Sequence, residues 1–382
     1  MRWPRDDAKL ERVRSLMAEE GLDALVVRAP DNVLYLTNFW SMKGYDACVF
    51  PRESEPVLIC LEASAEDVAR TAWTTDVRYV RGYDEADPRP VPARTLEAAL
   101  GVARGRVGLE LSLGTQASDR MVGEPTTFTK AWFDAFPDAV DAAPLLARAR
   151  MIKTEQEVAR LRIANDVATQ AMHHTRRQLQ PGMKEAEVAA LWQGHVHGQG
   201  TARDDVELAL PFSLIWAGKG IKTFTATGDL PVVEGEPVLF EIWVCTDGYW
   251  ADHTKNLVVG DLKPEYAELE QGLMGVYEQA IEACSPGRPM AELDRSVRAG
   301  LAELGYPGQP SHPICHGVGA RAHEPPYPHQ AAGGVFEESM VLAIEPGAYW
   351  EGGGGLRVED NFLVTADGSQ KLSSFPDGVV RC

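Results

Sequence analysis

Residues 238–256, VLFEIWVCTDGYWADHTKN, place two acidic residues among aromatic and β-branched residues that prefer to be buried. Asp247-Gly248 is a dipeptide favoured in two-residue type I′ hairpin turns, so a strand is predicted on each side of it. The register then pairs three sets of residues: Thr246 with Tyr249, Trp243 with Asp252, and Glu241 with Thr254. Opposed residues share a face, as do residues two apart on a strand, so Glu241 and Asp252 are predicted to be diagonal neighbours.

Two carboxylates that close together on a buried face repel each other, and a divalent cation commonly relieves this repulsion. The alternatives are an ion pair with Lys255 or a nearby arginine, or a solvent-exposed face. A three-residue loop would also shift the register by one residue and separate the two acids onto opposite faces. Further ligands elsewhere in the chain are therefore needed to decide for a metal site.

The segment SHPICHGVGARAHEPP, residues 311–326, contains three closely spaced histidines: His312, His316 and His323. A single histidine is more often a hydrogen-bonded structural residue, but three clustered beside glycines favour a functional site. Gly317 and Gly319 follow His316 and allow backbone or substrate to approach closely.

Two glutamates downstream lie in apolar surroundings. Glu345 ends an apolar run that Pro346-Gly347 stops, and Glu359 lies between Val358 and the strand-like segment NFLVT. A buried carboxylate requires a partner, and Arg357 is the alternative partner for Glu359.

The chain has 382 residues, more than one ordinary core supports, so two domains are expected. Within residues 1–150, five short apolar runs alternate with helical patterns and predict an α/β domain: ALVVRA, DACVF, PVLIC, VRYVRGY and RVGLEL. Turn residues between two of the runs predict a hairpin over residues 46–60. We find no catalytic constellation in this part of the sequence.

Longer helical patterns begin after LLARARMIKT, which places the second domain at residues 151–382. Thr154 and Glu157 form a capping box at the start of the first helix, and QPG ends it before a second helix. The plan of a helix, a Pro-Gly segment and a further helix recurs around SPG at residues 285–287. This weak repeat predicts a duplicated half-domain, with strands after each helix pair and a site between the halves.

Composition excludes several classes of function. Fifty-six acidic and 37 basic residues give a net charge of -19, which disfavours binding to nucleic acid or an anionic membrane surface. The N-terminal residues are too charged for a signal peptide, and no run of about 18 apolar residues would span a bilayer. Six cysteines without a CxxC pair are typical of free thiols. We therefore expect a cytoplasmic protein.

These residues resemble the metallopeptidase and creatinase group with the pita-bread fold, which includes methionine aminopeptidases, aminopeptidase P and prolidase. DALVVRAPDNVLYLTNF resembles the start of that group's N-terminal domain, and RMIKTEQEVARLRIA resembles its junction helix. The resemblance implies an α/β N-terminal creatinase-like domain followed by an α+β pita-bread catalytic domain. The family's five metal ligands, in motifs such as EPG and R(I/V)ED, fall on Glu241, Asp252, His316, Glu345 and Glu359.

The resemblance also implies an activity. It predicts an exopeptidase of the prolidase and Xaa-Pro peptidase branch that hydrolyses short peptides through attack of a metal-bound hydroxide. In this mechanism His323 stabilises the developing oxyanion, Glu345 moves the proton, and His312 contacts the substrate. The ligands suit one or two ions of Zn, Mn or Co. Family members are commonly homodimers, so we expect a homodimer.

The chain departs from the family pattern at two places. Glu241 stands where the peptidases use an aspartate, and its extra methylene favours loss of the first of the two metal sites. Residues 213–239 also lack a histidine that prolidase and aminopeptidase P relatives carry there. The substrate would then be held differently, and Lys219, Lys222 and Arg321 are candidates for contacting a substrate carboxylate.

Two other functions are compatible with the fold. One is a metal-free hydrolase of a small C–N compound, as in creatinase or ectoine hydrolase. The other is a non-catalytic binding module. Retention of Asp252, His316, Glu345 and Glu359 argues against the first, and the accompanying His312 and His323 argue against the second.

Overall fold

The computed structural model describes residues 3–40, 45–82, 90–112, 126–223 and 225–382, together with their side chains except at residues 126–128. The chain divides into two compact units, Met1–Arg150 and Met151–Cys382. Each unit has its own sheets and hydrophobic clusters.

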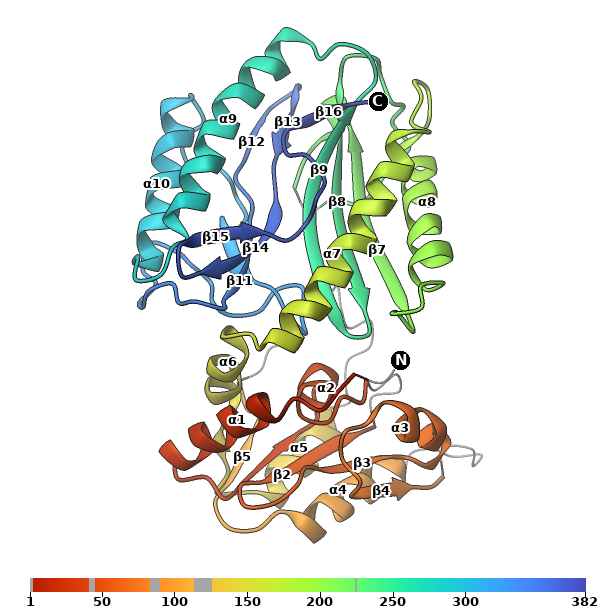
Figure 1. Cartoon of the computed structure of the whole chain (residues 1–382), viewed down its shortest axis with the longest axis vertical. Coiled ribbons are helices and arrows are strands. Elements are labelled where there is room, and N and C mark those ends of the chain that lie inside the picture. Colours follow the sequence, from red (N-terminus) through yellow and green to blue (C-terminus); the bar gives the residue numbers. More distant parts are fainter. Residues whose placement is uncertain (1–2, 41–44, 83–89, 113–125, 224) are drawn as a thin grey trace. The chain divides into compact units, whose positions relative to one another are not determined.

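The first unit contains a six-stranded mixed sheet with strand order β4-β3-β2-β1-β5-β6 (Figure 1). Its strands are β1 (Ala24–Val27), β2 (Ala47–Pro51), β3 (Val57–Leu61), β4 (Val77–Val80), β5 (Val107–Leu109) and β6 (Val140–Asp141). The five strands expected from the apolar runs are present, and β2 and β3 form the expected antiparallel hairpin. The two-residue strand β6 was not predicted, because a segment this short has no periodicity.

Helices cover both faces of this sheet. One hydrophobic cluster joins alternate strand residues such as Leu25 to α1 (Asp7–Glu19), α2 (Pro30–Thr37), α3 (Ala65–Thr71) and α6 (Ala143–Met151). A second cluster joins the intervening residues, such as Val26, to α4 (Val91–Val102) and α5 (Thr126–Ala135). Burial on both faces explains why the inner strands β1, β2, β3 and β5 are apolar throughout rather than alternating. The α/β expectation for this part of the chain is confirmed.

The second unit contains the two predicted helix pairs. They are α7 (Glu155–Arg176) with α8 (Glu185–His195), and α9 (Pro264–Ala283) with α10 (Met290–Glu303). The Thr154 hydroxyl and the Glu157 carboxylate form both hydrogen bonds of the predicted capping box at the start of α7. Strands follow each helix pair, as the weak repeat predicted (Figure 1).

The first half of this unit is a four-stranded sheet with order β16-β9-β8-β7, formed by β7 (Ala209–Ala217), β8 (Pro237–Thr246), β9 (Tyr249–Val258) and β16 (Val379–Arg381). The predicted hairpin register is confirmed at all three pairs. Asp247 and Gly248 both have positive φ angles, 48° and 88°, as a type I′ turn requires. Phe240 and Ile242 pack with residues of α7 and α8, so Glu241 points to the opposite face of the sheet.

The second half contains a four-stranded sheet, β10-β11-β14-β15, and a separate hairpin, β12-β13. The strands are β10 (Cys315–Gly317), β11 (Val341–Ile344), β12 (Gly347–Trp350), β13 (Gly354–Arg357), β14 (Asp360–Thr365) and β15 (Gly368–Lys371). One hydrophobic cluster joins these strands to α9 and α10. Each half therefore buries one helix pair against its own strands.

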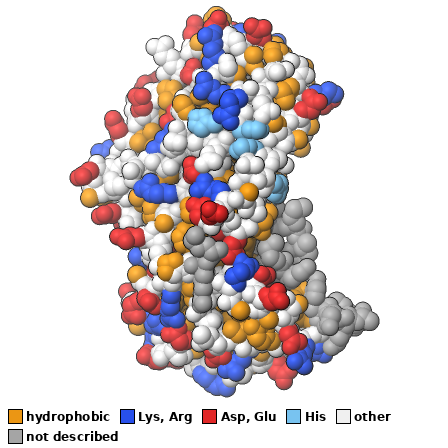
Figure 2. Space-filling model, turned by 45° about the vertical axis from the view of Figure 1, so that its right-hand side comes forward, with side chains coloured by type: hydrophobic (Ala, Val, Ile, Leu, Met, Phe, Trp, Pro, Cys, Tyr) orange, Lys and Arg blue, Asp and Glu red, His pale blue; other side chains and the backbone are white. Residues whose placement is uncertain are grey.

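Three further observations bear on the sequence analysis. The six cysteines, all of them among the described residues, form no disulfide, as predicted from their spacing. Among the described residues, no helix is both long enough and apolar enough to cross a bilayer. On the face drawn in Figure 2, Lys and Arg side chains are dispersed among Asp and Glu side chains.

Candidate metal centre

The five predicted ligands come from separate strands of the second unit and meet in its interior. Glu241 lies on β8, Asp252 on β9 and His316 on β10, while Glu345 follows β11 and Glu359 follows β13. All five side chains are buried. In three groups, ligand atoms lie within 4.8 Å of one another: Asp252, His316 and His323; His316, Glu345 and Glu359; and Glu241, Asp252 and Glu359.

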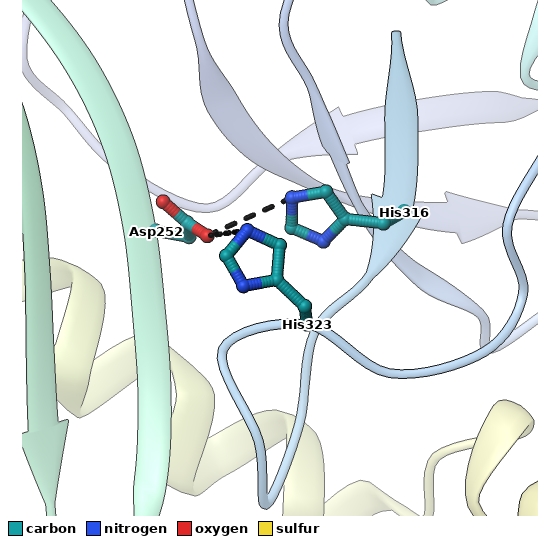
Figure 3. Close-up of side chains that lie close together, drawn as sticks. All are labelled: Asp252, His316 and His323. Carbon is teal, nitrogen blue, oxygen red and sulfur yellow. Dashed lines mark ion pairs between the residues drawn. The ribbon is translucent and has the colours of Figure 1, made fainter. Parts of the chain in front are cut away.

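Distances within the cluster leave space that is suited to an ion. The Nε2 atom of His316 lies 3.6 Å from Oδ2 of Asp252 and 3.3 Å from Oε1 of Glu345. The Nε2 atom of His323 lies 3.5 Å from the same Asp252 oxygen, and both imidazoles point toward it (Figure 3). Donor atoms thus converge on one point from strands far apart in the sequence.

Electrostatics within the cluster are unfavourable without a cation. Burial, followed by the charges of Glu359 and Glu345, raises the pKa of Asp252 well above its usual value. Burial and the charge of Glu345 raise the pKa of Glu359 to about 7. Burial alone would also raise the pKa of Glu345, but His312 and His316 lower it to about 2. The carboxylates therefore require positive charge beyond what the histidines provide.

Buried polar atoms without a hydrogen bond indicate where a cation would bind. Both carboxylate oxygens of Asp252 and Nε2 of His316 are buried and have no hydrogen-bond partner among the described residues. Buried polar atoms are rarely left in this state. A divalent cation coordinated by Asp252, His316, Glu345 and Glu359 would satisfy them, and carboxylate with imidazole suits Zn, Mn or Co. The residues present therefore fit a metal.

The loop that carries His323 folds back onto the strand that carries His316. Gly317 donates its N–H to the Pro326 carbonyl at 2.8 Å and also pairs with Glu324 in an isolated bridge. A Cβ atom at Gly317 would overlap the backbone carbonyl oxygens of Glu324 and Pro325. The predicted close approach at this glycine is confirmed, and it brings the two imidazole rings to a centroid distance of 4.2 Å.

Residues outside the predicted set hold the ligands in position. The Thr254 hydroxyl donates to Oε2 of Glu359 at 2.7 Å and accepts from Nε of Arg357 at 2.7 Å. The Asn361 amide donates to the Asp252 carbonyl at 2.8 Å. We did not predict these roles, although the hairpin register already places Thr254 on the face that carries Asp252.

Glu241 differs from the other predicted ligands because its ion-pair partner is an arginine. It forms an ion pair with Arg357, and both side chains are buried. Burial lowers the pKa of Arg357 to about 10, although the charge of Glu359 opposes this shift. The ion-pair alternative considered for the opening stretch thus applies to Glu241 and not to Asp252. Arg357 was expected beside Glu359, and its charge does lower the Glu359 pKa, but its ion pair is with Glu241.

The structure brings His312 and His323 to opposite ends of the cluster. Nδ1 of His312 lies 3.1 Å from Oε2 of Glu345, and Nε2 lies 3.1 Å from the Tyr349 hydroxyl. Burial disfavours the cationic form of His312, but Glu345 outweighs this effect and raises its pKa. The His323 side chain is 31% exposed, and burial together with His316 lowers its pKa to about 3. His323 is therefore a neutral imidazole between the cluster and solvent.

Two of the three cationic candidates line a cavity of about 590 Å³. Lys219 and Lys222 are exposed, and the cavity wall also contains Tyr349 and Gln309. Arg321 is buried and does not line this cavity. Since the Tyr349 hydroxyl also contacts His312, this wall continues into the metal-ligand cluster.

Comparisons with known proteins agree with this geometry. Metallopeptidase family M24 matches residues 159–366, and the creatinase/prolidase N-terminal domain matches residues 9–152. An Xaa-Pro dipeptidase of Lactobacillus delbrueckii subsp. lactis is 26% identical over 94% of this chain and 95% of its own length.

Solved structures show the same fold. The prolidase from Pyrococcus horikoshii OT3 superposes with a TM-score of 0.80 at 24% identity, over 97% of this chain and 99% of that one. An Xaa-Pro dipeptidase from Bacillus anthracis superposes with a TM-score of 0.82 at 21% identity, over 98% of this chain and 99% of that one. The fold class expected from the resemblance is confirmed. Because the family match covers more than half of its length, the chain belongs to metallopeptidase family M24 and is a metallopeptidase enzyme with a creatinase/prolidase N-terminal domain.

Proposed function

We propose that this chain is a metal-dependent exopeptidase that hydrolyses short peptides, Xaa-Pro dipeptides among them. Residues 151–382 are its catalytic domain and residues 1–150 its N-terminal domain. The observation that carries the proposal is the set of buried atoms on Asp252 and His316 that lack a hydrogen bond within a cluster of carboxylates. The Xaa-Pro dipeptidase relative, which this chain matches over nearly its whole length, supports the substrate class.

One ion is assigned to Asp252, His316, Glu345 and Glu359. Glu241 is left out of this set because its carboxylate pairs with Arg357 and its extra methylene departs from the aspartate of the family pattern. A divalent ion at this centre lowers the pKa of water and polarises a carbonyl.

The side chains around the centre are assigned to proton transfer, to positioning and to stabilisation of the oxyanion. Glu345 is assigned to accept the proton that the attacking water loses, because its carboxylate is a member of the ligand cluster and is oriented by His312 and His316. His312 holds Glu345 in position through Nδ1. The neutral imidazole of His323, at the solvent side of the cluster, donates a hydrogen bond to the oxyanion that develops on the peptide carbonyl.

The cavity beside the cluster supports recognition of the substrate's carboxyl end. The residue after the scissile bond is assigned to the Tyr349 side of the cluster, because His312 links Glu345 to the Tyr349 hydroxyl that lies beside the cavity. Lys219 and Lys222 place two cations around that cavity in a strongly acidic protein. A free carboxylate is the group they attract, which assigns the chain as a dipeptidase.

The test combines metal analysis with hydrolysis assays. Protein purified without added metal is expected to retain about one ion per chain and to cleave dipeptides until a chelator removes the ion. Dipeptide amides should be cleaved more slowly than free dipeptides, and Lys219→Met with Lys222→Met should abolish this difference. Lys184→Met, which removes an exposed lysine outside the cavity lining, is the matched control.

Three results would contradict the proposal. No metal and no cleavage after reconstitution with Zn, Mn or Co would point to a metal-free hydrolase or a binding module. Equal cleavage of dipeptides and their amides would refute recognition of the substrate carboxylate but would not contradict the peptidase activity. Two tightly held ions would contradict the single centre. The homodimer and the cytoplasmic location expected from the sequence stay predictions.

A further inference from the structure

An aromatic row crosses the sheet that carries the metal ligands. Phe212 on β7 is directly opposite Trp243 on β8, and Trp243 is directly opposite Asp252 on β9. Directly opposed residues share a face, so all three side chains lie on the face away from α7 and α8. Since β7 is the edge strand, the row leads from the edge of the sheet to a metal ligand.

Ring contacts continue the row to His323. The Phe212 and Trp243 rings are 5.2 Å apart between centroids and inclined by 36°. The Trp243 and His323 rings are 6.4 Å apart and inclined by 55°. Both distances are within the range in which aromatic pairs attract each other. The rings therefore form one continuous surface that ends at the solvent side of the cluster.

Exposure along the row decreases toward the metal ligand. Phe212 is 40% exposed, Trp243 is 9% exposed and Asp252 is 1% exposed. A single exposed phenylalanine is common on protein surfaces and has no meaning by itself. Phe212 is different because its ring packs on Trp243, which in turn contacts the proposed catalytic histidine His323.

The dimensions of the row match a short peptide. Adjacent strands are about 4.8 Å apart, so the three positions cover about 10 Å. Extended peptide advances by about 3.3–3.6 Å per residue. A peptide carbonyl that accepts a hydrogen bond from His323 therefore brings a neighbouring side chain within reach of the indole of Trp243 and the phenyl ring of Phe212.

We propose that Phe212 and Trp243 form the subsite for the side chain that precedes the scissile bond, and that this subsite selects apolar residues such as leucine and phenylalanine. This proposal rests on the proposed peptidase function. The lysine-lined cavity adjoins the cluster through His312, whereas the aromatic row adjoins it through Asp252 and His323. The row is therefore assigned to the amino-terminal side of the scissile bond.

The experiment measures kcat/KM for dipeptides that differ only in their first residue. The wild-type protein should prefer leucine and phenylalanine over glycine at that position. Phe212→Ala should lower kcat/KM for the two apolar substrates by about tenfold while leaving the glycine substrate unchanged. Phe212→Leu should restore most of the preference, because it returns apolar surface without an aromatic ring.

Two controls separate selectivity from general damage. Phe133→Ala truncates a phenylalanine of similar exposure, 43%, in the first unit and should change nothing. Metal content per chain should be the same in all variants, since Phe212 is not one of the proposed ligands and its ring packs on Trp243. The Phe212 variants thus report on the substrate side chain and not on the metal.

Three outcomes would overturn the subsite. An equal loss for all dipeptides would give Phe212 a structural role. An unchanged preference together with an altered mass in sedimentation would identify the exposed ring as an interface between copies of the chain. Loss of selectivity for the second residue instead of the first would show that the row contacts the side chain after the scissile bond. Absence of any cleavage by metal-loaded wild-type protein would contradict the peptidase function itself.

Discussion

Arg357 on β13 forms a buried ion pair with Glu241 on β8, next to the ligands Asp252 and Glu359. A guanidinium is a permanent cation whose fork matches a carboxylate. Its positive charge therefore lies beside Glu241, the longer side chain that replaces an aspartate of the family pattern. The pair gives this buried carboxylate a partner other than a metal.

Replacing Glu241 with aspartate tests this relationship. Shortening the side chain by one methylene moves the carboxylate away from Arg357 and toward Asp252, so the metal-to-protein ratio should rise from about one to about two. Glu241→Gln, which has the original length without the charge, should keep the ratio near one. Elemental analysis of dialysed protein measures both variants. An unchanged ratio in Glu241→Asp would mean that this residue does not decide the number of ions.

Removing a ligand should abolish metal retention. His316→Ala and Glu345→Ala each delete one of four proposed donors, so the ratio after gel filtration should fall to nearly zero. His197→Ala and Glu351→Ala remove exposed residues of the same types and serve as matched controls. Undiminished metal in either ligand variant would refute the assignment of the centre.

Thr254 should affect the metal through Glu359. Thr254→Val keeps the shape of the side chain but removes the hydroxyl that donates to Glu359 and accepts from Arg357. Loss of such a supporting contact weakens metal affinity by about 10–100-fold. Thr254→Ser preserves both hydrogen bonds and should bind metal as the wild type does. Competition with a chelator measures the affinity, and equal values for the valine and serine variants would exclude the positioning role.

A histidine pair far from the metal centre should make stability depend on pH. The rings of His174 on α7 and His195 on α8 stack at a centroid distance of 4.2 Å. Burial, then the charges of His174 and Arg177, lower the pKa of His195. Below about pH 6.5 the unfolded chain binds a proton that the folded chain does not, so stability present above that pH is lost as the pH falls.

His195→Gln removes this titration. The wild type should therefore lose more stability than the variant between about pH 7 and pH 5, as measured by urea unfolding midpoints. His197→Gln changes an exposed histidine in the turn after α8 and should keep the wild-type slope. Parallel pH curves for wild type and His195→Gln would show that the stacked pair does not contribute.

The sequence by itself determined the local structure and the candidate ligands. Asp247-Gly248 specified the turn, and the turn specified which strand residues share a face with Asp252. The capping box at Thr154 and the Pro-Gly segments marked helix boundaries for the same reason, since turn and cap chemistry acts within a few residues. The ordered ligand motifs were recognisable because each is a short local pattern.

Only the tertiary structure decided how distant segments meet. Arg357 lies more than a hundred positions from Glu241, and Phe212 is on a strand whose pairing with Trp243 no local pattern specifies. The Tyr349 contact with His312 depends likewise on how β12 packs near the loop before β10. Side-chain pairing across strands follows from packing and register, which many weak interactions fix together. The candidate ligands can therefore be identified from the sequence, whereas the side chains that contact them cannot.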